Sequence, residues 1–283
     1  KFFAGSGHTW QEILALANEE KPLPRFALPA SIRAEVKIET TSVESQNVIG
    51  ILPGTDPQLK NEYVVLSAHL DHIGVGQPIK GDKIYNGAMD NASGIATLLE
   101  TALALQKKQA RLRRSVIFAA VTAEEKGLLG SHYFASRPTV PPQSLIANVN
   151  VDMFLPLYPL RSLVVQGLEE SNLADDVRQV GTALGLQVLS DPEPERNAFT
   201  RSDQYSFIQQ GIPAVSLKVG FTKDSPEHQI LKRWRTERYH APADDLNQPV
   251  DLQAAVEFNR AYLAIVEAIA NRAERPRWNA DSF

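Results

Sequence analysis

The pattern of apolar and polar positions predicts buried strands separated by amphipathic helices. Three nearly uninterrupted apolar runs have the character of strands covered on both faces: Tyr63–Ala68, Ser115–Thr122 and Ile146–Met153. Leu163–Gln166 and Ala214–Val219 look like further strands. In Ala92–Gln109, apolar residues recur at the spacing of one helical face. Helices are also expected at Leu128–Ser136, Leu173–Leu184, Ser202–Gln210 and Leu252–Ala273.

The order of these elements indicates the fold class. Strand, helix, strand, helix, strand at these lengths is typical of βαβ units. We therefore expect an α/β fold with a mostly parallel central sheet and helices on both faces. The glycine-rich stretch Gly74–Gly87 is expected to be a surface excursion.

The N-terminal part has a different pattern. A short helix is expected at about Thr9–Asn18, with Thr9 and Glu12 as a capping box, and a proline-rich stretch follows it. The alternation in Ile32–Thr41 predicts a half-buried strand, and Asn47–Leu52 predicts a second. We interpret residues 1–34 as a connecting segment and residues 35–283 as the main domain.

Composition removes several function classes. The chain has 283 residues, of which 43% are hydrophobic, so it can bury a sizeable core. Its net charge of −4 gives no electrostatic reason to expect nucleic acid as a partner, and no apolar run approaches the roughly 20 residues of a membrane helix. Because cysteine is absent, a transition metal would need histidine and carboxylate ligands.

Residues of the metal-ligand type follow successive predicted strands. His69 and Asp71 follow the first buried run, Glu124 and Glu125 the second, and Asp152 the third. Since the carboxyl ends of parallel strands meet at one edge of a sheet, these side chains should lie together. Several carboxylates at close range repel one another, so we expect one or two bound cations to neutralise their charge.

Two further residues complete this hypothesis. Asp90 lies in a turn of small residues where a carboxylate could reach two metal ions, and His240 lies in a late loop. Asp71 is placed to accept the imidazole N–H of His69. His72 is an alternative ligand, although in an extended chain it would point away from His69.

Several motifs together resemble a known family. They are Ser67–His72, Asn86–Gly94, Thr122–Ser131, Asn150–Met153, Ser202–Gln204 and Tyr239–His240. In this order they resemble the secreted di-zinc aminopeptidases, the family of the bacterial leucyl aminopeptidases that also contains glutamate carboxypeptidase II and the transferrin receptor ectodomain. The resemblance covers about residues 45–270 and implies the zinc-peptidase, phosphorylase/hydrolase-like fold.

The resemblance also implies roles for single residues. Asp90 would bridge two Zn²⁺ ions and precede a cis peptide bond, with His69 and Asp152 completing one site. Glu125 and His240 would complete the other site. Glu124 would be the general base, and Tyr239 would help to hold the oxyanion.

Other features of the resemblance bear on context. Members often carry an inserted protease-associated domain, and Lys1–Pro29 resembles the return from one. The Ser-Asp-His common in the family reads Ser202-Asp203-Gln204 here. Secreted relatives and a first residue other than Met lead us to expect a periplasmic or secreted protein.

The function expected is hydrolysis of N-terminal residues from peptides with a free N-terminus by a di-zinc aminopeptidase. Met153, Phe154, Phe199 and Phe221 could line the pocket for the first side chain. Two alternatives stay open. A carboxypeptidase acting on acidic peptides would need a cation such as Arg201 or Lys218, whereas a receptor-like binding module would need no catalytic base. The sequence leaves the oligomeric state open.

Overall fold

The structure is a computed structural model in which residues 2–19, 21–28 and 31–282 are described. The chain divides into two compact units, Lys1–Glu44 and Ser45–Phe283. In the first unit, helix α1 (Trp10–Asn18) begins at the expected capping box. Thr9 Oγ1 accepts from the Glu12 amide at 3.1 Å, and the Glu12 carboxylate accepts from the Thr9 amide at 3.3 Å. Residues 1 and 29, which bound the stretch that resembles the return from an inserted domain, lie outside the described residues.

The strand expected at Ile32–Thr41 is wrong. This stretch has no regular secondary structure, and its apolar side chains lie in solvent: Ile32, Val36 and Ile38 are each more than 70% exposed. Alternation of apolar and polar residues shows which face of a segment would be buried if the segment paired with a neighbouring strand. Within the described chain no strand pairs with residues 32–41, so this segment does not form a strand despite its alternation.

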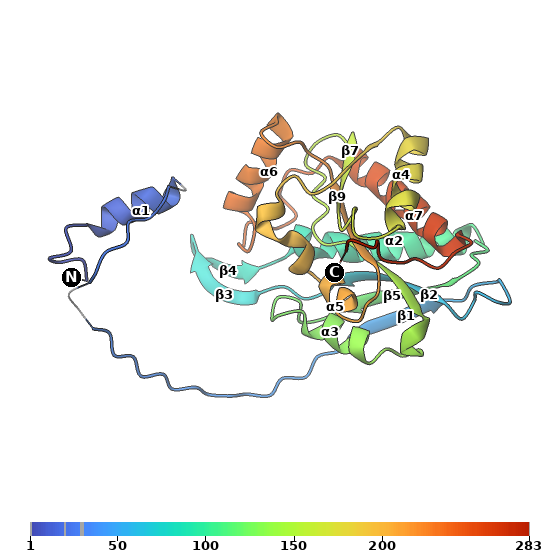
Figure 1. Cartoon of the computed structure of the whole chain (residues 1–283), viewed down its shortest axis with the longest axis horizontal. Helices are drawn as coiled ribbons and strands as arrows, with labels where there is room; N and C mark the ends of the chain where they lie inside the picture. The colour runs from blue at the N-terminus through green and yellow to red at the C-terminus, as the bar shows by residue number, and fades with distance from the viewer. Residues whose placement is uncertain (1, 20, 29–30, 283) are drawn as a thin grey trace. The chain divides into compact units, whose positions relative to one another are not determined.

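The second unit is built on one mixed sheet, and its seven strands in spatial order are β1-β5-β2-β6-β9-β7-β8 (Figure 1). The strands are β1 (Val48–Leu52), β2 (Tyr63–His69), β5 (Ser115–Val121), β6 (Leu145–Asn150), β7 (Ser162–Gln166), β8 (Gln187–Leu189) and β9 (Ala214–Val219). The middle strands β5, β2, β6 and β9 are mutually parallel. Strand β1 pairs antiparallel with β5, and β7 pairs antiparallel with β9. The expected mostly parallel sheet is confirmed, and the short strand β8 was not predicted.

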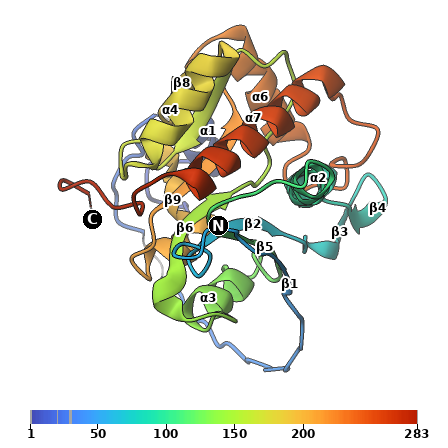
Figure 2. The ribbon, with the colours of Figure 1, turned by 90° about the vertical axis from the view of Figure 1, so that its right-hand side faces the viewer.

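Helices cover both faces of this sheet. Figure 2 shows α2 (Ser93–Lys107), α4 (Leu173–Leu184) and α7 (Leu252–Asn271) on one face, and α3 (Leu129–Ser136) on the other. The apolar stripe of α7 is fully buried among strand residues of that first face. Helix α3 packs with α5 (Gln204–Ile208), through Phe134 and Phe207, in a second core on the opposite face. Because both faces are covered, the parallel strands can be apolar throughout.

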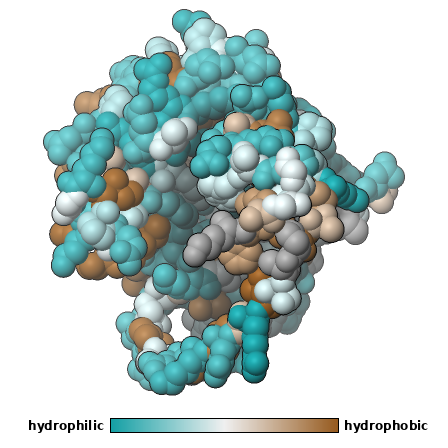
Figure 3. Space-filling model, turned by 90° about the vertical axis from the view of Figure 1, so that its left-hand side faces the viewer, coloured by the Kyte–Doolittle hydropathy of each residue, from teal (hydrophilic) through white to brown (hydrophobic). Residues whose placement is uncertain are grey.

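Two further elements complete the second unit. The excursion Gly74–Gly87 contains a two-stranded hairpin, β3 (Gly74–Ile79) and β4 (Asp82–Tyr85). Helix α6 (Pro226–Glu237), which was not predicted, begins at an N-cap in which Ser225 Oγ accepts from the His228 amide. Figure 3 shows one face of the molecule, on which hydrophilic residues predominate. Among the described residues, no helix has both the length and the apolar character needed to cross a membrane.

Candidate metal centre

The residues predicted for the site come together at the carboxyl ends of the parallel strands. His69 ends β2, Glu124 and Glu125 follow β5, and Asp152 follows β6. Nε2 of His69 lies 3.2 Å from an oxygen of Asp90 and 3.5 Å from one of Asp152.

The second group of contacts surrounds the other oxygen of Asp90. Nε2 of His240 lies 3.3 Å from this oxygen and 3.2 Å from Glu125. Asp90 therefore stands between two sets of ligand-type side chains.

Two clusters of these side chains have metal-ligand spacing. One contains His69, Glu124 and Asp152, and the other contains His72, Asp90 and Glu125. His72 was set aside in the sequence because an extended chain would turn it away. The strand ends at His69, so the extended geometry does not persist, and Nδ1 of His72 reaches to 2.8 Å from Glu125.

Several buried ligand atoms in these clusters approach one another closely, but without the geometry of a hydrogen bond to any described residue. They are Nε2 of His69, both ring nitrogens of His72, Oε1 of Glu125 and Oδ1 of Asp152. Unpaired buried polar atoms are costly, and so many in one place are uncommon. Nitrogen and carboxylate donors that converge in this way fit the binding of a transition metal such as Zn²⁺.

The turn that carries Asp90 depends on two glycines. Gly87 has a φ of 67°, and a Cβ there would lie 2.4 Å from the carbonyl oxygen of Asp90. At Gly94 a Cβ would lie 2.3 Å from Oδ1 of Asn91 and 2.6 Å from the carbonyl oxygen of Val151. The Asp90–Asn91 peptide bond is cis, as expected.

Asn91 joins this turn to the segment after β6. Its Nδ2 donates to the carbonyl of Val151 at 3.0 Å, and its Oδ1 accepts from the amides of Gly94 and Met153. The backbone on either side of Asp152 is therefore fixed relative to Asp90.

Asp71 acts differently from the prediction. Nδ1 of His69 lies 3.0 Å from the backbone carbonyl of Asp71 and 3.9 Å from its carboxylate. The carboxylate instead accepts from the backbone amides of Glu124 at 3.0 Å and Glu125 at 3.3 Å. Asp71 thus orients the imidazole through its main chain and holds the Glu124–Glu125 turn through its side chain.

Asp244 is a site residue that sequence reasoning missed. It is fully buried, and its carboxylate accepts from the backbone amides of Met89 at 2.8 Å and Asp90 at 3.0 Å. Gln248 donates to the same carboxylate at 2.5 Å, and its own carbonyl accepts from Trp234 at 2.6 Å. The only signal in the sequence is its place four residues after His240.

The substituted position Gln204 also has a defined role. Its Oε1 accepts from Asn150 Nδ2 at 2.8 Å, and Asn150 Oδ1 accepts from Ser67 Oγ at 2.7 Å. These bonds tie α5 to β6 and β2 directly beneath the ligands. Next to Gln204, Asp203 is fully buried, and burial raises the pKa of its carboxyl to about 7.

The clustered groups strongly perturb one another. Contacts with Asp90 and Glu125 raise the pKa of His240 to about 10. Burial opposes charge on Glu125, yet His240 and His72 outweigh it and lower the pKa of Glu125 to about 2. Burial also opposes charge on His69, but the carboxylates of Asp152 and Asp90 raise its pKa well above the ordinary value.

Glu124 and Tyr239 face the same space as the clusters. Burial, reinforced by the charge of Asp152, raises the pKa of Glu124 to about 9. Burial raises the pKa of Tyr239 to about 12, so its hydroxyl keeps its proton at neutral pH and can donate a hydrogen bond. The Tyr239 ring stacks on that of His240 with centroids 3.9 Å apart.

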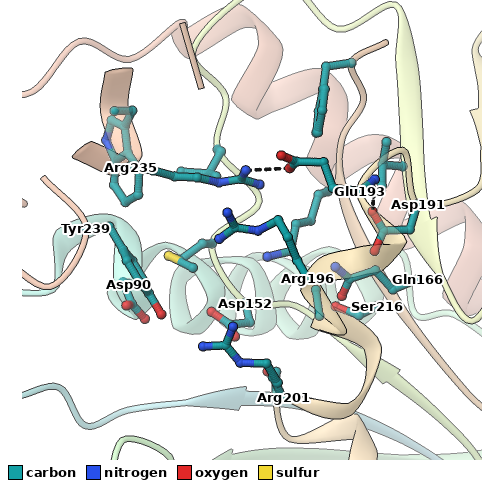
Figure 4. A pocket seen from close by; sticks show the side chains of 18 of the residues that line it. Asp90, Asp152, Gln166, Asp191, Glu193, Arg196, Arg201, Ser216, Arg235 and Tyr239 are labelled. Carbon is teal, nitrogen blue, oxygen red and sulfur yellow. Dashed lines mark hydrogen bonds and ion pairs between the residues drawn. The ribbon is translucent and has the colours of Figure 1, made fainter. Parts of the chain in front are cut away.

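The clusters open into a pocket that contains Asp90, Glu124, Asp152, Tyr239 and His240 (Figure 4). Met153 and Phe221 line it, as predicted. Phe154 does not, because its ring stacks on Phe258 in the core at 4.3 Å. Phe199 lines a separate surface pocket instead.

Comparisons with known proteins identify a peptidase family and several aminopeptidases as similar to this chain. The sequence model of peptidase family M28 matches residues 47–266. A probable leucine aminopeptidase 2 of Aspergillus fumigatus is 31% identical over 255 residues, which cover 85% of this chain and 46% of that protein. Aminopeptidase YwaD of Bacillus subtilis is 29% identical over 226 residues, or 78% of this chain and 44% of that protein. The chain spans less than half the length of these curated relatives.

A solved structure shows the same fold. The zinc aminopeptidase BSAP from Bacillus subtilis superposes with a TM-score of 0.62 and 25% identity, covering 81% of this chain and 50% of that one.

Proposed function

Since the chain belongs to peptidase family M28, we propose that it is a di-zinc aminopeptidase that removes N-terminal residues from peptides. The observation that carries the proposal is the pair of adjacent ligand clusters on the wall of a pocket that also contains Tyr239. Asp90 belongs to one cluster and lies 3.2 Å from His69 of the other. The names of the relatives and of the solved zinc aminopeptidase support it.

Each residue of the site has a proposed part. Asp90 would serve both ions, and His69 and Asp152 would complete one site. Glu125 and His240 would complete the other, with His72 close enough to take part. Zinc in these sites would act as a Lewis acid on the scissile carbonyl and would lower the pKa of a bound water to about 7.

The chain's own residues supply the proton transfers. Glu124 is held by the Asp71 carboxylate through its backbone amide, which fixes the direction of its side chain. Its raised pKa makes it a strong proton acceptor once it is ionised, so it can take a proton from water and return it to the leaving amine. The Tyr239 hydroxyl can donate to the oxygen that gains negative charge in the transition state.

A carboxypeptidase is the second candidate, and one observation favours it. Arg201 and Lys218, the cations that could hold a substrate carboxylate, both line the pocket. A receptor-like binding module is disfavoured because Glu124 and Tyr239 are both placed at the clusters, where a module without catalysis needs neither.

The test compares substrates that differ only at the N-terminus. The zinc-loaded protein would be assayed with leucyl-alanyl amide and with its N-acetyl form, and again after chelation and zinc restoration. We expect hydrolysis of the free-amine peptide, loss with the chelator and recovery with zinc. Equal cleavage of the two forms would exclude an aminopeptidase, and zinc content well below two ions per chain would count against the di-zinc centre.

Two expectations taken from the resemblance remain proposals. The first is that the protein is periplasmic or secreted, and cell fractionation of the native host tests it. The second is that residues 1–34 connect to a protease-associated domain, which the sequence of the whole gene decides.

A further inference from the structure

One buried side chain joins the wall of the pocket to the metal centre. Trp234, on α6, lines the pocket and is only 3% exposed. Figure 4 shows Arg235, its neighbour in the chain, and Tyr239 on the same side of that pocket. The indole N–H of Trp234 donates to Oε1 of Gln248 at 2.6 Å. Since an indole N–H can only donate, the group that it meets must present an oxygen.

The side-chain amide of Gln248 is held in one of its two orientations. While its oxygen faces Trp234, its Nε2 donates to Oδ1 of Asp244 at 2.5 Å and to the backbone carbonyl of Asp245 at 2.9 Å. A reversed amide would bring its N–H groups against the indole N–H and its oxygen against two other oxygens. Gln248 is buried, so water cannot easily replace a lost partner. The bond from Trp234 therefore helps to keep the donor of Gln248 on Asp244.

The Asp244 carboxylate is the next member of this chain of hydrogen bonds. One of its oxygens accepts from the amide of Met89 and the other from the amide of Asp90. A fully buried carboxylate is stable only as far as N–H donors replace the water that it has lost. Gln248 supplies one of these donors, so its bond helps to hold Asp244 in place. The chain of bonds thus runs from the pocket wall to the turn that carries Asp90.

The same bond closes the loop that carries two further residues of the site. Trp234 and Gln248 are 14 residues apart in the chain, and Tyr239 and His240 lie between them. Residues 238–251 form no helix or strand, so single hydrogen bonds determine the path of this loop. A bond between its two ends restricts the positions that the loop can adopt. Loss of that bond would therefore loosen the His240 side of the metal centre as well as the turn of Asp90.

We propose that Trp234 is a positioning residue for the metal centre, which acts through Gln248 and Asp244 on the turn of Asp90. The proposal rests on the proposed metal-dependent function and gives one residue of the pocket two tasks. Its ring forms part of the pocket wall, and its N–H fixes the path of the backbone that presents the metal ligands. Removing the N–H alone should therefore weaken zinc binding while the pocket wall stays in place.

Two simpler roles for Trp234 predict different results. If its hydrogen bond served only the stability of the fold, its loss would lower Tm by the same amount with and without zinc. The zinc affinity of the folded protein would then stay at the wild-type value. If the ring served only as pocket wall, a change there would alter KM alone. Zinc affinity therefore separates the positioning role from both of these.

The variants are Trp234→Phe, Gln248→Met and the two changes combined. Phe keeps an aromatic ring at the pocket wall and removes the N–H, and Met keeps the length of Gln without its amide. Each change has a matched control outside the pocket. Trp278→Phe removes an indole N–H that donates to a backbone carbonyl at 2.9 Å. Gln253→Met removes an exposed amide that donates to a carboxylate at 2.8 Å.

The first measurement is the affinity of the full chain for zinc alone. Metal is stripped from the folded protein, and added zinc is then shared between the protein and a chromophoric chelator. We expect the dissociation constant to rise about tenfold for Trp234→Phe and for Gln248→Met, as is typical when a residue that supports a metal ligand is lost. Both controls should keep the wild-type value. Because the two side chains act in one chain of bonds, the combined variant should bind zinc about as weakly as either single variant.

The second measurement is turnover of leucyl-alanyl amide at saturating zinc. Trp234→Phe should lower kcat about tenfold with little change in KM, because the ring remains while the turn of Asp90 is displaced. Trp234→Leu removes the ring as well and should also raise KM. If Gln248→Met does not fold, Trp234→Phe and its control Trp278→Phe still give the result.

The outcomes separate the positioning role from the proposed function. Wild-type zinc affinity in Trp234→Phe and Gln248→Met, with the peptide still cleaved, would overturn the positioning role and leave the peptidase intact. Weaker zinc binding in these variants, without cleavage of any peptide by the wild type, would support the positioning role and overturn the peptidase. Losses that add in the combined variant, or an equal loss in Trp278→Phe, would refute a chain of bonds from the pocket to the metal centre.

Discussion

Replacing Asp244 by Asn should destabilise the protein far more than the same change at the next residue. The Asp244 carboxylate is fully buried and accepts from two backbone amides of the turn that carries Asp90. Asn has the same shape, but it offers only one carbonyl oxygen, and its amide group would face one of the two N–H donors. One buried donor is therefore left without an acceptor.

The magnitude follows from these bonds. A hydrogen bond to a charged acceptor contributes about 1.5–3 kcal/mol, and an unsatisfied buried donor costs about 1–3 kcal/mol. Since Asn keeps part of one bond, we expect a loss of about 2–4 kcal/mol from a typical total of about 5–15 kcal/mol. For a unit of this size, that loss lowers Tm by roughly 5–15 °C.

The control is Asp245→Asn. Asp245 is only partly buried, and its carboxylate accepts from the nearby Asn247 amide at 2.8 Å, so this change should cost less than about 1 kcal/mol. Thermal unfolding by circular dichroism would be followed with and without zinc. The rise in Tm on adding zinc should also be smaller for Asp244→Asn, because the turn of Asp90 is displaced. Two variants that melt within 2 °C of each other would show that the carboxylate does not hold this turn.

Three other predictions concern the site. Glu124→Gln should keep two zinc ions while the rate falls by about 10²- to 10⁴-fold, whereas Glu125→Gln should lose zinc from the His240 side; metal analysis with kinetics checks this, and the opposite pattern would reverse the roles. Zinc binding should release protons at pH 7, because His240, whose pKa is about 10 without metal, must become neutral to bind. The affinity for zinc should therefore fall roughly tenfold for each unit by which the pH is lowered, for each proton released. Titration calorimetry in buffers of different ionisation enthalpy can show this, and a pH-independent affinity would contradict it. Gly94→Ala should cost at least about 1–3 kcal/mol because its Cβ would overlap Asn91, whereas Gly50→Ala, with its nearest atom 4.0 Å away, should be nearly neutral in the same melting experiment; similar Tm values would count against the close packing.

The sequence predicted those parts of the fold in which local pattern and tertiary environment agree. The runs at Tyr63–Ala68 and Ser115–Thr122 are apolar on both faces because helices cover both faces of the sheet, so pattern alone located them. Ile32–Thr41 has an equally regular pattern, but nothing in the described chain pairs with it. The alternation of apolar and polar residues shows that a segment could form a strand, but it does not show whether a neighbouring strand is available to pair with it.

Strand ends located only part of the site, whereas Asp90 was found from its turn of small residues and His240 from the family resemblance. His69, Glu125 and Asp152 were found because parallel strands bring their carboxyl ends to one edge. Asp244 was not found, because its part depends on a hydrogen bond to a turn 154 residues away in the chain. The reach of His72 was equally hidden, because it depends on where strand β2 ends.

The ligand-type residues arrive from segments that span the sequence from His69 to His240, and this spacing has a consequence for folding. No short fragment contains a complete site, so zinc cannot nucleate folding locally as it does in a zinc finger. The long loops between the ligands must close first, at the entropic cost of non-local contacts. Zinc should therefore bind late and select the native state by mass action, and its main kinetic effect should be to slow unfolding rather than to speed folding.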